Sequence, residues 1–222
     1  MNADQGQTAR ASYNKMSRVY GLLSNSSEKK FVEVAVRQVL KPEPAEIILE
    51  PGFGTGQVLA ALAEMVGDGG KVCGIDISDG MVEATRRRLA RKDLEGGTEL
   101  VRGDASKMPY EDDFFDGLFM SFTLELFPDD EIPVVLAECA RVLKENGRIC
   151  VACMSDRGKD GAMKRLYVRA HRKFPHFVDC RPIFARKALE SSGFDIAEER
   201  ILSMWGLPVE IVLGRTGDRE LD

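Results

Sequence analysis

Long apolar runs, paired cysteines and an excess of positive charge are all missing from this chain of 222 residues. No apolar stretch approaches the roughly 18 residues that a membrane-spanning helix requires. The net charge of −5 disfavours tight binding to the phosphate backbone of a nucleic acid. The polar segment 1–5 lacks the apolar core of a signal peptide, and five cysteines at irregular spacing are typical of a reducing compartment. We therefore expect a cytoplasmic protein that has no membrane span and no nucleic-acid partner.

The most informative segment is an apolar run that leads into a glycine-rich turn at 47–56, Ile-Ile-Leu-Glu-Pro-Gly-Phe-Gly-Thr-Gly. The pattern predicts a strand at 47–50, a helix at 57–66 and a second strand that ends in Asp76. A strand, a glycine turn, a helix and a strand ending in a carboxylate form the first half of a nucleoside-binding crevice.

The glycine turn also lacks two features of phosphate-binding loops. A dinucleotide site uses the pattern G-x-G-x-x-G, but Gln57 stands where the third glycine would be, and the Lys-Ser/Thr pair of a P-loop is absent. A ligand with a base, a sugar and a small zwitterionic tail fits better, and S-adenosylmethionine (SAM) is such a ligand. Its carboxylate can approach the loop N–H groups and the positive end of the following helix. Its cationic groups suit Glu50, and its ribose hydroxyls can donate to Asp76.

Several segments resemble motifs of the class I SAM-dependent methyltransferases. Residues 50–56, E-P-G-F-G-T-G, are similar to the first motif of that family, and residues 76–81 are similar to its D-x-S-x-x-M segment. Residues 103–110 resemble G-D-A…L-P-F, and residues 141–147 resemble R-V-L-K-P-G-G with Glu-Asn in place of Pro-Gly. Within the superfamily, residues 115–124 look most like the ubiquinone/menaquinone-biosynthesis C-methyltransferase group.

The resemblance implies roles for residues at the ends of the first three strands. Gly52, Gly54 and Gly56 would shape the loop around the methionine part of SAM. Asp76 would take the ribose, and Ala105 would offer backbone contacts.

The resemblance also implies contacts around the adenine and the sulfonium. Ile77 and Met81 would sandwich the adenine, and Asp104 would accept from its amino group. Ser121 and Phe122 would close the sulfonium side. Core packing is the alternative for Met81 and Phe122, because both residue types commonly fill protein cores.

The reaction follows from the ligand. A sulfonium is already a reactive electrophile, so the protein mainly aligns a nucleophile behind the methyl group and excludes water. Glu125, just after the predicted strand 115–121, is the first candidate for a general base. His171 and Tyr20 are further catalytic candidates, although a structural or surface role is the alternative for His171. The other residues considered as bases are Tyr13, Tyr167, His176 and Asp179. We expect no metal ion.

Alternating strands and helices predict an α/β fold with a mostly parallel sheet covered by helices on both faces. Further strands are expected at 99–103, 115–121, 148–154, 195–204 and 208–213, and further helices at 12–24, 28–40, 79 onward, 129–143, 162–174 and 181–192. The resemblance implies a Rossmann-like seven-stranded sheet whose last strand is antiparallel. It also implies that a helical insertion after strand five serves as a substrate lid.

We interpret residues 1–222 as a single methyltransferase domain. Its expected parts are an N-terminal helical cap at 1–43, a cofactor-binding core at 44–154, a lid insertion at 155–180 and a C-terminal helix and strand pair at 181–214. The segment Cys150-Val-Ala-Cys153 falls on a predicted strand, where residues three apart face opposite sides, so we do not expect a metal or redox pair.

The cap and the insertion are rich in aromatic and apolar residues, which indicates a small acceptor that is largely apolar or amphipathic. A phospholipid amine or a small thiol is the alternative acceptor, and a SAM-binding regulator without transfer activity is the alternative function. A nicotinamide-dependent oxidoreductase is a further alternative, against which Gln57 argues. The basic insertion could contact a membrane surface peripherally or be a solvated face. We expect a monomer or a homodimer.

Overall fold

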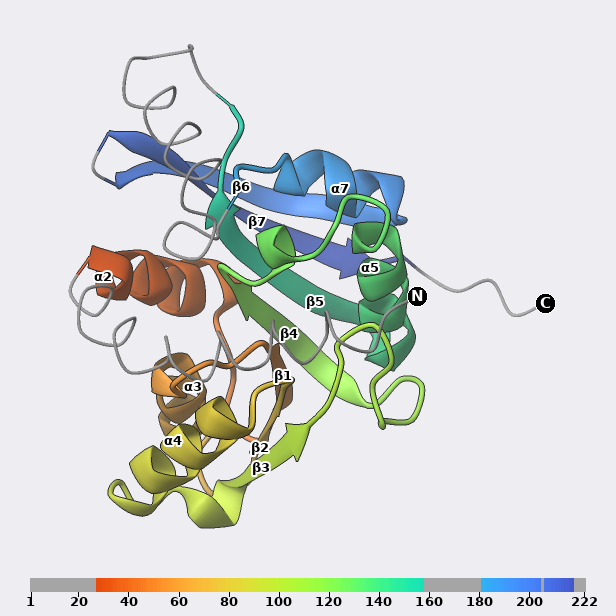
Figure 1. The fold of residues 1–222 in the computed structure, drawn as a ribbon. Helices are drawn as coiled ribbons and strands as arrows, with labels where there is room; N and C mark the ends of the chain where they lie inside the picture. Colours follow the sequence, from red (N-terminus) through yellow and green to blue (C-terminus); the bar gives the residue numbers. More distant parts are fainter. Residues whose placement is uncertain (1–26, 158–180, 205, 218–222) are drawn as a thin grey trace, which may run out of the picture.

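The computed structural model describes residues 27–157, 181–204 and 206–217. Seven strands form one sheet in the order β3-β2-β1-β4-β5-β7-β6 (Figure 1). The strands are β1 (Ile47–Pro51), β2 (Lys71–Asp76), β3 (Thr98–Arg102), β4 (Phe115–Ser121), β5 (Leu143–Met154), β6 (Phe194–Met204) and β7 (Leu207–Thr216). Strands β1 to β5 are parallel, and β7 pairs antiparallel with both β5 and β6. The predicted seven-stranded α/β sheet with an antiparallel last strand is confirmed.

Helices cover both faces of the sheet (Figure 1). They are α2 (Ser27–Glu33), which continues as a π-helix η1 (Val34–Leu40), and α3 (Gln57–Val66), α4 (Asp79–Ala90), α5 (Ile132–Val142) and α7 (Ala185–Ser191). One core cluster joins η1, α3 and α4 to one face of the sheet, and a second joins α5 and α7 to the other. Cys150 packs in the first cluster and Cys153 in the second, which confirms that the two thiols point apart.

Some element boundaries differ from the predictions. Strand β5 begins at Leu143 instead of 148, because Leu143 pairs with Phe115 across an irregularity in the β4–β5 ladder. The short helix α7 begins at Ala185, several residues after Pro182. The predicted helices at 12–24 and 162–174 lie outside the described residues.

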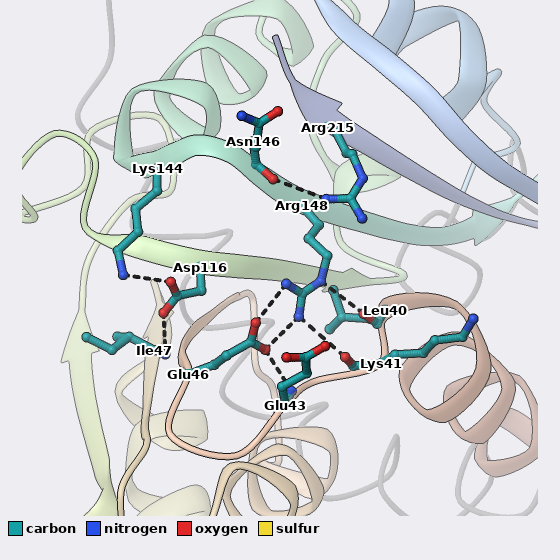
Figure 2. A network of polar contacts seen from close by, with 10 residues as sticks. All are labelled: Leu40, Lys41, Glu43, Glu46, Ile47, Asp116, Lys144, Asn146, Arg148 and Arg215. Atoms are coloured by element: carbon teal, nitrogen blue, oxygen red, sulfur yellow. Dashed lines mark hydrogen bonds and ion pairs between the residues drawn. The ribbon is translucent and has the colours of Figure 1, made fainter. Parts of the chain in front are cut away.

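Ion pairs connect the amino-terminal ends of the central strands (Figure 2). The Arg148 guanidinium donates to both carboxylate oxygens of Glu46, at 2.8 and 2.6 Å, and to the Leu40 carbonyl at 3.1 Å. Asp116 accepts from the Lys144 ammonium at 2.6 Å and from the first backbone N–H of β1 at 2.8 Å. These contacts tie the end of η1 and the start of β1 to β4 and β5. The predicted site residues lie at the opposite, carboxyl-terminal ends of the strands.

Among the described residues, each helix is too short or too polar to span a bilayer. These residues also contain no group of three or more His, Cys, Asp or Glu side chains placed to hold a metal ion.

Candidate cofactor site

The chain turns sharply between β1 and α3. Gly52, Gly54 and Gly56 have φ angles of 69°, 52° and 70°, in the left-handed region that residues with a Cβ rarely adopt. Gly56 is the N-cap residue of α3. The three glycines therefore bend the chain from the end of a buried strand directly into the first turn of a helix.

The surroundings of the three glycines differ. A Cβ added to Gly52 would lie 2.3 Å from Cγ2 of Thr123, and one added to Gly56 would lie 2.3 Å from Cγ2 of Thr85. A Cβ on Gly54 would have no atom of the described residues within 4 Å. The outer glycines are therefore needed for packing, whereas no described side chain fills the space beside the middle glycine, and a ligand can approach it there.

Asp76, the last residue of β2, is hydrogen-bonded to this loop. Its Oδ2 accepts from the Gly54 N–H at 3.0 Å, and its Oδ1 accepts from the Ser78 N–H at 2.9 Å. Burial raises the pKa of Asp76, and these two backbone N–H groups partly oppose that rise. Each carboxylate oxygen can accept a further hydrogen bond. Asp76 thus fixes the loop and keeps acceptor capacity for the hydroxyls of a sugar.

Glu50 stands at the end of β1 next to the loop and is 2% exposed. Its buried Oε2 has no hydrogen-bond partner among the described residues. Burial, and secondly the charge of Asp76, raise the pKa of Glu50 well above its usual range. A buried carboxylate oxygen without a donor is costly, and a cationic ligand group would satisfy it.

The residues expected around an adenine follow β2. Ile77 is 50% exposed, which is high for an isoleucine and leaves an apolar surface for a flat ring. Met81 is buried in the first turn of α4, and its N–H donates to the Ser78 hydroxyl, the N-cap of that helix, at 3.4 Å. The two side chains that the resemblance assigns to the adenine thus differ, because Ile77 is available and Met81 is packed.

Asp104 and Ala105 follow β3. Asp104 is exposed, and its Oδ1 accepts from both the N–H and the hydroxyl of Ser106 at 2.8 Å. Ala105 is buried in the core beneath it. The bonds from Ser106 hold the Asp104 carboxylate in one orientation at the same edge of the sheet.

The end of β4 completes the site. Ser121 and Phe122 are half-buried, and Phe122 has a φ of 49°, a strained value for an aromatic residue. Its N–H donates to the Ala152 carbonyl at 2.7 Å. Glu125, in the short 3₁₀ turn η3 (Leu124–Leu126), is 1% exposed, and its Oε1 accepts from the Met154 N–H at 3.1 Å. The carboxylate of the candidate base thus joins η3 to the end of β5.

Strands β2, β1 and β4 are neighbours in the sheet, so the structure brings their carboxyl ends together. The direction of strand order reverses between β1 and β4, and open α/β sheets bind ligands at such a reversal. Glu50 and Asp76 interact there, and Phe122 follows the last residue of the neighbouring β4. His171 and Tyr20 lie outside the described residues. Sequence reasoning missed Thr85 and Thr123, because threonines in a helix or a loop carry no distinguishing signal.

Solved structures with the same architecture define the class of fold. A SAM-dependent methyltransferase from Aquifex aeolicus superposes with a TM-score of 0.66 at 19% identity, covering 91% of this chain and 97% of the other. The [4+2]-cyclase SpnF superposes with a TM-score of 0.69 at 18% identity, covering 85% of this chain and 80% of the other. At this level of identity, the likeness shows the class I methyltransferase fold and does not fix an activity.

Sequence comparisons then place the core of the chain in a family. The family model of the methyltransferase domain matches residues 48–147. The nocamycin O-methyltransferase of Saccharothrix syringae is 39% identical over 135 residues, 60% of this chain and 47% of that protein. A demethylmenaquinone methyltransferase of Symbiobacterium thermophilum is 39% identical over 109 residues, 49% of this chain and 43% of that protein.

This chain therefore matches the methyltransferase domain over residues 48–147 and is similar to relatives of the ubiquinone/menaquinone-biosynthesis group, as its motifs indicated. It spans about half the length of these curated relatives.

Proposed function

We propose that the protein binds SAM at the carboxyl edge of β1, β2 and β4 and transfers its methyl group to a small acceptor. The observation that carries this proposal is the bond from the Gly54 N–H to Asp76, beside the buried Oε2 of Glu50. This arrangement supplies a sugar acceptor, a site for a cation and an open glycine surface within one short stretch of chain. SAM supplies the reactive methyl group when it is bound.

Each residue has a separate task in this proposal. Asp76 accepts from the ribose hydroxyls, and Glu50 offers a carboxylate to the cationic tail of the cofactor. Ile77 covers one face of the adenine, and Asp104 accepts from its amino group. Phe122, held by its bond to the end of β5, borders the methyl group and helps to exclude water.

The acceptor is small and largely apolar. A third core cluster, made of Phe31, Met154, Met204, Leu207 and Val209, contains the end of β5 and the tip of the β6–β7 hairpin. Phe122 packs against this buried cluster, so the side chains next to the position where the methyl group would leave the cofactor are apolar. The demethylmenaquinone methyltransferases among the relatives make quinols the first acceptors to test, followed by phospholipid amines and small thiols.

A binding experiment tests the cofactor. Titration calorimetry with SAM and NADH in parallel should show binding of SAM alone, because Gln57 replaces the third glycine of a dinucleotide loop. Selective binding of NADH would contradict the proposal. Incubation with the acceptor panel, followed by mass spectrometry of S-adenosylhomocysteine and of the methylated product, then identifies the acceptor.

A SAM-binding protein without transfer activity is the second candidate. The likeness to a cyclase indicates that this fold is not confined to methyl transfer. The Glu125 carboxylate also accepts a backbone hydrogen bond within the protein, which suits a structural role as well as a basic one. Binding of SAM without turnover across the whole panel would favour this candidate.

A further inference from the structure

Three carbonyl groups of the glycine loop accept hydrogen bonds from side chains outside the loop. The Thr123 hydroxyl shares its one proton between the Ser121 carbonyl at 3.0 Å and the Gly52 carbonyl at 3.3 Å. From α4, the Thr85 hydroxyl donates to the Gly54 carbonyl at 2.9 Å, and Arg88 Nε donates to the Thr55 carbonyl at 2.7 Å. The loop is therefore held by two elements that do not belong to the β1–α3 unit.

The two threonines hold the loop by packing as well. The Thr123 side chain fills the space where a Cβ of Gly52 would stand, and the Thr85 side chain does the same at Gly56. Thr85 is fully buried. A helical threonine commonly bonds a carbonyl one turn earlier in its own helix, whereas Thr85 donates to the loop.

These bonds decide which way the peptide groups of the loop face. A trans peptide is planar, so its N–H points away from its C=O. When Thr85 draws the Gly54 carbonyl toward α4, the N–H of Thr55 in the same peptide turns to the opposite side. Thr123 acts in the same way on the peptide that joins Gly52 to Phe53. The outer side chains thus determine which N–H groups the loop presents to a ligand.

We propose that Thr85 is a positioning residue that pre-forms the glycine loop for the cofactor, with Thr123 and Arg88 in the same role. The inference rests on the proposed function, since the loop must bind SAM for its shape to matter. A loop that is already ordered loses less conformational freedom on binding, and the affinity is higher for that reason.

Two substitutions separate the hydrogen bond from the packing. Thr85→Val keeps the methyl group against Gly56 and removes the hydroxyl, whereas Thr85→Ser keeps the hydroxyl and removes the methyl group. Titration with S-adenosylhomocysteine, which cannot react, should give about 3- to 10-fold weaker binding for Thr85→Val, the range for one lost hydrogen bond. Thr85→Ser should bind within about twofold of the wild type.

Amide hydrogen exchange without ligand gives a second measure. We expect faster exchange at Thr55 in Thr85→Val, and wild-type exchange in the strands β1 and β2. Arg88→Met should shift binding in the same direction, and it carries the test if Thr85→Val fails to fold. Arg87→Met is the matched control, because Arg87 lies on the same helix and is 65% exposed in its side chain.

The outcomes are distinguishable. Wild-type binding by both Thr85→Val and Arg88→Met would refute the inference and leave the proposed function standing. Weaker binding by Thr85→Ser together with wild-type binding by Thr85→Val would also refute it, because packing and not the hydrogen bond would then be responsible. Absence of binding by the wild-type protein would refute the proposed function, and the inference with it.

Discussion

Replacement of Asp76 by alanine should weaken the binding of SAM. The substitution removes the acceptor proposed for the ribose, and it also removes the partner of the Gly54 and Ser78 N–H groups. Hydrogen bonds to a charged group contribute about 1.5–3 kcal/mol each. Loss of the Asp76 charge also relieves its repulsion of Glu50, which strengthens the attraction of Glu50 for a cation and offsets part of the loss. We expect the binding free energy to become less favourable by about 1–3 kcal/mol, which raises Kd about 5- to 150-fold.

Isothermal titration with SAM and with S-adenosylhomocysteine measures this effect. Asp79→Ala is the matched control, because Asp79 begins α4 nearby, is 65% exposed in its side chain and pairs only with Arg102 in the described structure. The control should bind within about twofold of the wild type. Far-ultraviolet circular dichroism should show that Asp76→Ala remains folded. An unchanged affinity in folded Asp76→Ala would contradict the assignment of the whole site.

Three other substitutions test separate parts of the molecule. Because the folded-state pKa of Glu50 is raised, its contribution to stability is present below its unfolded pKa of about 4.3 and is lost as the pH rises through the folded value. As the pH rises above about 4.3, the stability measured by urea unfolding should therefore fall less for Glu50→Gln than for the wild type. Glu50→Gln should also bind SAM more weakly, and equal pH profiles would contradict this account. Glu125→Gln should lower turnover without changing SAM affinity if Glu125 is the base, and full retention of activity would remove it from that role. Arg148→Met should lower the free energy of unfolding by roughly 2–4 kcal/mol, because it leaves the largely buried Glu46 without its charged partner and, among the described residues, with only the Glu43 N–H as a donor. SAM affinity should stay the same, because the cofactor site lies at the opposite ends of the strands. Urea titration measures the loss, and a loss below about 0.5 kcal/mol would show that the ion pair contributes no more than a surface pair.

Local patterns were sufficient to predict most of the elements that carry the site. The bounds of α3 and β4 and the end of β2 at Asp76 agree with the predictions, because apolar periodicity and flanking glycines act over a few residues. Ser78 caps α4, because its hydroxyl accepts from the Met81 N–H. Strand β5 was predicted too short, since its first residues pair only through an irregular contact with β4.

The amino-acid sequence by itself determined the glycine turn, the carboxylate at the end of β2 and the class of ligand that they suit. Those features depend on neighbours in the chain and on which residues tolerate a left-handed backbone. Only the tertiary structure decided what surrounds the turn. Thr85 and Thr123 lie 31 and 71 residues from the glycines to which they donate, and the Met154 N–H lies 29 residues from the Glu125 carboxylate. Contacts at such separations arise when the sheet and its helices pack together, and no short stretch of sequence records them.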